Sequence, residues 1–231
     1  RRVYTKLNPF VVLLGKGNHE ITSSWTEPNG VENETTLDIT RSNITFVGKG
    51  KGTTTILGGF HIEILENITF KNMTVTNTSD NGSGINIRNA KVELFDVALD
   101  GCGNSGLFIG LQTTNSTSAT TSETTVVATR CEFANSLCGA FVEGGLDTAT
   151  FKNCVFRDHT HHGIYACQAT IHLHGEATAI HSNRDLGIFA CDSGKVLLHL
   201  PSHHNTTYNN GHQDQYTSRG GTITNVQDSN N

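Results

Sequence analysis

Apolar and polar residues alternate in short runs along most of the chain. In residues 170–174, for example, Ile171 and Leu173 are each flanked by polar side chains. A period of two is typical of β-strands with one buried face. Gly- and Asn-rich turns separate the runs, and none of them has the roughly ten residues of helical periodicity that would indicate an α-helix. The pattern therefore predicts an all-β chain built from many short strands.

These runs belong to a repeat of about 21 to 24 residues, most copies of which end in a glycine followed by an apolar, an aromatic and an apolar residue. Successive copies begin at Asn67, Ala90, Thr124, Asp147 and Ala169. Strands this short cannot form a sheet within one copy, so they must pair between copies. A chain that advances about 4.8 Å per turn does this. The repeat predicts a parallel β-helix of about eight coils.

Equivalent positions of successive coils should stack into columns, and we expect three columns to fill the interior. They are Val92, Val126, Ala149 and Ile171; Leu94, Ala128, Phe151 and Leu173; and Phe108, Phe141, Tyr165 and Phe189.

The 231 residues are interpreted as one domain, with coils over residues 9–200. Residues 111–123 are a Thr/Ser-rich stretch that interrupts the repeat, and we interpret them as an inserted loop. Residues 201–231 are polar and break the repeat. We expect them to form a C-terminal cap, because an uncovered end of a solenoid would pair with another molecule.

The segments Pro9-Phe-Val-Val-Leu-Leu-Gly and Ile44-Thr-Phe-Val-Gly-Lys-Gly resemble the opening coils of pectin-lyase-like β-helix proteins, and the resemblance extends over roughly residues 9 to 200. It implies a single-stranded right-handed parallel β-helix. This fold hosts lyases, hydrolases, esterases, epimerases, adhesins and inert scaffolds, so it does not imply one function.

The catalytic signatures of these enzymes are missing from the sequence. The Asn-Thr-Asp, Asp-Asp and Gly-His-Gly series of polygalacturonases does not occur. Nor does the Tyr-Gly-(Val/Ile)-Asp-Pro-His-Asp motif of alginate epimerases, whose nearest counterpart is Gly163-Ile-Tyr-Ala-Cys-Gln-Ala. The acidic calcium-binding clusters of pectate lyases have no evident counterpart. No family catalytic residue can therefore be assigned here.

Six cysteines fit the register of the repeat. Cys131 and Cys154 fall in one column on adjacent coils, as do Cys167 and Cys191. Neighbouring strands place their Cα atoms close enough for a disulfide, and a buried pair of reduced thiols fits equally well. Both alternatives remain open at this stage, and Cys102 and Cys138 are a third candidate pair.

Histidine is the unusual feature of the C-terminal part, because ten of the twelve histidines follow residue 158. The turns 157–162 and 181–185 occupy the same place on successive coils. They could bring together a cation, a base and an acid, the groups needed to act on an acidic sugar. The candidate catalytic residues are Asp158, His159, His162, Arg184 and Asp185, and the candidate substrate-binding residues are His172, His174 and His181.

Ordinary solvated histidines are the stronger interpretation, because outward polar residues on a β-helix usually contact water or their own backbone. A Zn²⁺ or Ni²⁺ site made by His172, His174 and a neighbour is a further alternative. We expect no resident metal or cofactor.

Composition narrows the functional class. The net charge of −5 argues against nucleic acid as the main partner, and no apolar stretch approaches the roughly 18 residues of a membrane span. Eight Asn-X-Ser/Thr sequons favour an extracellular, cell-surface or virion-surface location. They lie at Asn33, Asn43, Asn67, Asn72, Asn77, Asn81, Asn115 and Asn205.

We therefore expect a non-catalytic β-helix that acts as a structural or carbohydrate-binding surface module, with glycans or other protein subunits as partners. The first alternative is a lyase or epimerase on acidic glycans that uses the His/Asp/Arg edge. The second alternative is an assembly component of a larger protein complex.

Overall fold

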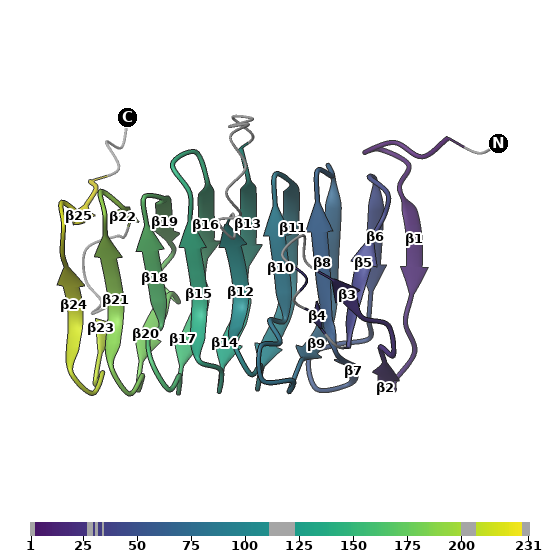
Figure 1. The fold of residues 1–231 in the computed structure, drawn as a ribbon, viewed down its shortest axis with the longest axis horizontal. Coiled ribbons are helices and arrows are strands. Elements are labelled where there is room, and N and C mark those ends of the chain that lie inside the picture. Colours follow the sequence, from purple (N-terminus) through teal and green to yellow (C-terminus); the bar gives the residue numbers. More distant parts are fainter. Residues whose placement is uncertain are drawn as a thin grey trace.

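The computed structural model describes residues 3–26, 30, 32–33, 35–110, 123–199 and 207–227. These residues contain 25 strands and no helix, and therefore no helix that could span a membrane. The strands stand side by side along the long axis of the molecule, from the N-terminal to the C-terminal end (Figure 1). The all-β prediction is confirmed.

One sheet contains eight parallel strands and is called here the eight-stranded face. Its strands span about seven turns, close to the eight coils that the repeat predicts. In spatial order they are β5 (Thr36–Ile39), β8 (Gly59–Glu63), β10 (Ile85–Arg88), β12 (Ser105–Gly110), β15 (Cys138–Glu143), β18 (Ile164–Cys167), β21 (Leu186–Cys191) and β24 (Gln213–Thr217).

The second sheet has 15 parallel strands and forms two further sides of each coil. The two sides are joined by the long strands β9 (Ile68–Thr76) and β11 (Lys91–Asp100). The first side also contains β1 (Phe10–Leu13), β6 (Ile44–Val47), β13 (Thr125–Thr129), β16 (Thr148–Lys152), β19 (Thr170–His174), β22 (Lys195–His199) and β25 (Thr222–Asn225). The second side contains β2 (Gly17–Glu20), β7 (Thr54–Leu57), β14 (Glu132–Ala134), β17 (Val155–Arg157), β20 (Ala179–His181) and β23 (Thr207–Tyr208).

The strands of both sheets pair in parallel between successive coils, which makes the chain a right-handed parallel β-helix, as the sequence predicts. A separate antiparallel pair, β3 (Trp25–Thr26) with β4 (Glu32–Asn33), leaves the helix before β5.

The bend between the two sides of the 15-stranded sheet uses one residue per coil in the left-handed backbone region. Asn72, Asp96, Arg130 and Asn153 have φ of 57°, 52°, 53° and 53°, and Gly175 follows with φ of 91°. Asn, Asp and Gly adopt this region most readily, which explains their recurrence at the turns. The Arg130 side chain donates hydrogen bonds to the Asp96 carboxylate at 2.9 and 2.6 Å.

Two of the three predicted interior columns are confirmed. The column from Val92 to Ile171 and the column from Leu94 to Leu173 pair in register, and their members are at most 1% exposed. The interior also contains Phe133 and Phe156, whose rings stack with centroids 4.4 Å apart.

The third predicted column is wrong, because Phe108, Phe141, Tyr165 and Phe189 point outward. In the repeated glycine–apolar–aromatic–apolar segment the two apolar residues flanking the ring face inward. In β12 these are Leu107 and Ile109, both completely buried. The alternation of a strand then places the ring between them on the outer surface.

The sequence predicts an inserted loop at residues 111–123 and a C-terminal cap at residues 201–231. The predicted inserted loop lies outside the described residues, apart from Glu123. Within the predicted cap, residues 207–225 contain strands β23, β24 and β25, which pair in register with β20, β21 and β22. Every residue of β24 is exposed, so the last strand of the eight-stranded face is the polar edge that a cap would provide.

Candidate functional site

One outward column runs along the whole eight-stranded face. Its members occupy the same register position on successive strands and change in character from polar to aromatic. From the N-terminal end they are Asp38, His61, Asn86, Phe108, Phe141, Tyr165, Phe189 and Tyr216.

The polar part of this column is covered by the antiparallel pair. The ring of Trp25 in β3 stacks on His61 with centroids 3.6 Å apart, and the guanidinium of Arg88 lies 5.1 Å from the Trp25 ring centroid. The Nδ1 atom of His61 lies 2.9 Å from an Asp38 carboxylate oxygen. Burial lowers the pKa of His61, and the hydrogen bond to Asp38 offsets part of that shift.

The aromatic part is accessible and is called here the aromatic column: Phe108, Phe141, Tyr165, Phe189 and Tyr216. Successive ring centroids lie 5.3, 4.4, 5.0 and 5.5 Å apart, with interplanar angles of 15° to 46°. Because the rings stack along the helix axis, their edges and the tilted parts of their faces are turned outward. Beside them lies a groove of about 330 Å³, lined on its polar side by Asn104, His161 and His162.

His162 lies at the edge of this groove, between the aromatic column and Asp185. Its ring lies 5.8 Å from Tyr165 and 5.5 Å from Phe189. Its buried Nδ1 has no hydrogen-bond partner and lies 3.6 Å from an Asp185 carboxylate oxygen. Burial lowers the pKa of His162, and the charge of Asp185 offsets part of this. The other carboxylate oxygen of Asp185 lies 4.0 Å from His212 Nδ1.

The predicted catalytic cluster is only partly assembled. His162 and Asp185 lie together, as predicted. Asp158 accepts a hydrogen bond of 2.5 Å from Arg157, which also binds Glu132, so its carboxylate belongs to a surface ion-pair network. Arg184 is exposed at the adjoining turn.

The assignment of His159 to this cluster is wrong, because its side chain points into the helix and is 1% exposed. It belongs to a chain of hydrogen bonds between buried turn residues of successive coils. In each step of this chain a backbone N–H donates to a side chain on the next coil, at 3.1 to 3.2 Å. The four donor–acceptor pairs are Cys102 to Ser136, Ser136 to His159, His159 to Asn183, and Asn183 to Asn210. A buried N–H without a partner is costly, so each coil supplies an acceptor for the previous one.

Sequence reasoning missed this buried turn, although a signal was present. Ser136, His159 and Asn183 each lie two residues after the end of a short strand, at equivalent places in the repeat. Three residues able to accept a hydrogen bond at one repeat position indicate a shared structural task.

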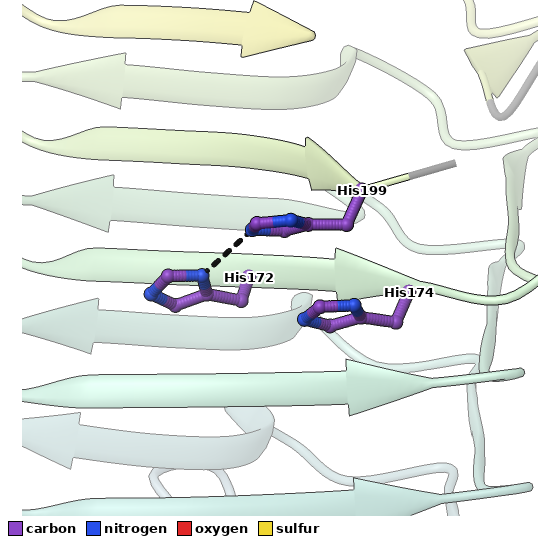
Figure 2. A group of neighbouring side chains, drawn as sticks. All are labelled: His172, His174 and His199. Atoms are coloured by element: carbon purple, nitrogen blue, oxygen red, sulfur yellow. Dashed lines mark hydrogen bonds between the residues drawn. The ribbon is translucent and has the colours of Figure 1, made fainter. Parts of the chain in front are cut away.

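The predicted substrate-binding histidines divide into two places. His172 and His174 of β19 lie beside His199 of β22, with all three rings on one outer surface (Figure 2). His172 Nδ1 lies 3.0 Å from His199 Nε2, and the rings of His174 and His199 stack with centroids 4.2 Å apart. His181 of β20 is separate and stacks on Tyr208 at 4.9 Å.

The six cysteines are buried free thiols. Cys167 and Cys191 face each other across β18 and β21, as the register predicts, and Cys191 Sγ hydrogen-bonds to the Tyr165 hydroxyl at 3.2 Å. Cys131 and Cys154 precede the paired strands β14 and β17. The third pairing is out of register, because Cys138 lies opposite Ser105.

The sequons differ in accessibility. Asn77 is completely buried, and its side chain accepts a hydrogen bond from Thr35 and donates one to the Ser83 carbonyl. Asn67 donates to the side chain of Asn43 at 2.9 Å, and these two residues, like Asn72, are half-buried. Asn81 is exposed. The side chains of Asn33, Asn115 and Asn205 are outside the described part of the chain.

No family model matches the chain, and no curated protein matches it. Among solved structures, ORF18 of Geobacillus virus E2 is 10% identical, with a TM-score of 0.42, over 94% of this chain and 54% of the viral protein. The chain thus spans about half the length of that viral protein. A pectin methylesterase in complex with hexasaccharide VII is 11% identical, with a TM-score of 0.43, over 99% of this chain and 86% of the enzyme.

The A-module of the mannuronan C-5 epimerase AlgE4 of Azotobacter vinelandii is 12% identical, with a TM-score of 0.32, over 96% of this chain and 90% of the module. Nothing about activity follows from likenesses this distant. The parallel strand pairing described above identifies the fold as a right-handed parallel β-helix.

Proposed function

We propose that this protein is a non-catalytic β-helix that binds a glycan along the aromatic column of its eight-stranded face. The single observation that carries the proposal is the accessible column of five rings with a groove beside it that has polar groups on one side. A glycan ligand suits a place outside a cell or on a virion, which the sequons also favour.

The chemistry of the groove fits a sugar chain. Ring edges carry partial positive charge and ring faces partial negative charge. Outward edges therefore suit hydroxyl and ring oxygens, while the tilted faces of Phe141 and Tyr165 offer apolar contact to sugar C–H groups. Asn104, His161 and His162 line the same groove and supply hydrogen-bonding groups.

The shape of the site indicates an extended ligand. Its volume of about 330 Å³ lies at the small end of ligand pockets, which range from about 300 to 1,000 Å³. A compact ligand would gain little burial there. A polymer lying along the helix axis could contact several rings at once, and affinity would come from repeated weak contacts.

Glycan-array binding followed by calorimetry tests this proposal. We expect the intact chain to bind at least one polysaccharide. Phe141→Ala and Tyr165→Ala should each weaken binding about tenfold, as expected for loss of an aromatic contact of about 1.4 kcal/mol. Tyr208→Ala is the matched control, because Tyr208 is an exposed aromatic residue on the other sheet. Binding to no glycan, or equal losses in the control, would contradict the proposal.

One observation favours a second candidate, an enzyme acting on acidic glycans. His162 lines the groove, and its buried, unpartnered Nδ1 lies 3.6 Å from an Asp185 carboxylate oxygen. A histidine beside a carboxylate is a common arrangement for a general base. In the described residues, however, Asp158 and His159 have the separate structural partners given above.

A further inference from the structure

Three histidines from two adjacent strands converge on the outside of the 15-stranded sheet, on a different side of the coil from the aromatic column. His172 and His174 are two residues apart in β19, and His199 lies directly opposite His174 in β22. One nitrogen from each ring lies within 4.8 Å of the other two. We infer that His172, His174 and His199 form a binding site for a divalent transition-metal ion of the Zn²⁺, Ni²⁺ or Cu²⁺ type.

The backbone holds the three ligands in place before any ion arrives. Strand β19 is paired on one side with β16 and on the other with β22, which is itself paired with β25. Residues i and i+2 of a strand project from the same face, and a directly opposite residue lies about 5 Å away. The backbone of all three ligands is therefore fixed before an ion binds, and little backbone entropy would be lost.

The distances are close to those that a metal requires. Zn²⁺ binds imidazole nitrogen at about 2.0 to 2.1 Å, which places two ligand nitrogens of a tetrahedron about 3.4 Å apart. His172 Nδ1 and His199 Nε2 are already 3.0 Å apart, and the third nitrogen has at most about 1.5 Å to move.

Ring rotation is the rearrangement that binding needs. The three ring planes lie within 11° to 23° of one another, so lone pairs that lie in those planes do not yet meet at one point. All three side chains are half-buried, so part of each ring is accessible to solvent. The ion would replace the hydrogen bond between His172 and His199.

The ligand set selects the class of ion. Imidazole nitrogens suit Zn²⁺, Cu²⁺ and Ni²⁺, whereas Ca²⁺ and Mg²⁺ require oxygen ligands, and the cluster contains no carboxylate. Lys152 of β16 lies opposite His174 on this surface. Its positive charge repels a bound cation. Three protein ligands would leave a fourth position for water or a partner group.

Titration of the whole chain with Co²⁺, a spectroscopic substitute for Zn²⁺, tests the site. We expect one equivalent to bind with the visible absorption of a low-symmetry Co²⁺–imidazole complex. The double variant His172→Ala/His199→Ala should bind at least about 100-fold more weakly, since even changes behind the ligands weaken metal affinity 10- to 100-fold. Zn²⁺ should displace Co²⁺ and abolish the absorption.

His181→Ala is the matched control, because it removes a half-buried histidine of the same sheet outside the cluster. It should bind Co²⁺ like the parent chain, and circular dichroism should show the same β-structure in every variant. Unchanged Co²⁺ affinity in the double variant would overturn the inference. Absence of the absorption band from the parent chain at millimolar Co²⁺ would overturn it as well.

Discussion

The Nδ1 atom of His159 accepts a hydrogen bond of 3.2 Å from the backbone N–H of Ser136, one coil earlier in the helix. The opposite nitrogen, Nε2, donates to the carbonyl of Phe133 at 3.1 Å. Only a neutral imidazole offers one acceptor and one donor. Burial accordingly lowers the pKa of His159 to about 4.

This buried imidazole makes the fold sensitive to acid. In the unfolded chain His159 should titrate near 6.5, so between about pH 6.5 and pH 4 the unfolded state binds more protons than the folded state. Stability is therefore lost as the pH falls through this window. The predicted loss from His159 is about 2 to 3 kcal/mol between pH 7 and pH 4.5, measured as the free energy of unfolding in urea.

His159→Asn is the diagnostic variant, because Asn183 fills the equivalent position one coil later with the same pattern of acceptor and donor. The variant should lose most of this acid dependence. The other buried histidines titrate in both proteins and cancel in the comparison. An unchanged pH dependence in His159→Asn would contradict this role.

Two neighbouring residues of β12 should differ sharply in their contribution to stability. Leu107→Ala removes a completely buried side chain and should reduce the free energy of unfolding by about 2 to 5 kcal/mol. Phe108→Ala removes a larger side chain from the outer surface. It should reduce the free energy of unfolding by only about 1 kcal/mol, mostly because the stack on Phe141 is lost. Equal losses in guanidinium unfolding would mean that the assignment of inside and outside is wrong.

The sequence predicted the fold because its strongest signals are local and repeated. Alternation identified the strands, and the period of about 21 to 24 residues identified the pairing between coils. The same signals misplaced Phe108 and its equivalents, because large aromatic residues were assumed to be interior. Leu107 and Ile109, on either side of Phe108 in β12, both point into the interior. Because side chains of a strand alternate between its two faces, the Phe108 ring must point outward.

The candidate sites were harder to predict, because they depend on register across coils. His172 and His174 were identified as an outward pair from one strand, but His199 joins them only through the pairing of β19 with β22. His159 and His162 are three residues apart in one turn and have opposite orientations, one inside the helix and one in the groove. Repeat counting assigns a residue to a turn without giving the direction of its side chain.

Glycosylation should distinguish two sequons that lie four residues apart. Asn81 is exposed and should carry a glycan when the chain is secreted from a eukaryotic host. Asn77 is completely buried and hydrogen-bonded, so a glycan there would prevent its packing. Glycopeptide mass spectrometry of the folded, purified protein measures the occupancy of both. High occupancy at Asn77 would contradict the buried position.

The thiols should resist modification until the chain unfolds. Burial raises the pKa of Cys102 to about 11 and of Cys167 to about 12, so neither thiol supplies the reactive thiolate at neutral pH. We expect Ellman's reagent to detect no thiol in the native protein and six after unfolding in guanidinium. Two missing thiols would indicate one disulfide, at Cys131–Cys154 or Cys167–Cys191, and peptide mapping would assign it.

Assays on uronic-acid polysaccharides separate the two candidate functions. If the protein only binds glycans, the parent chain should release no unsaturated product. Product formed by the parent and lost in His162→Ala would establish the enzymatic candidate, since His162 lines the groove and lies beside Asp185. His159→Ala is unsuitable here, because it removes buried hydrogen bonds and would lower activity by destabilising the fold. Hydrolase and epimerase assays complete the comparison.

The even spacing of the aromatic column has a further consequence. Each strand from β12 to β24 on the eight-stranded face presents one ring at the same register, and successive strands are about 4.8 Å apart. A polymer lying along the axis would meet nearly the same surroundings after every such step. Its binding energy would then have several shallow minima instead of one deep minimum, so a bound chain could slide from ring to ring without being released. Such a surface would retain a polymer while leaving it free to move lengthwise.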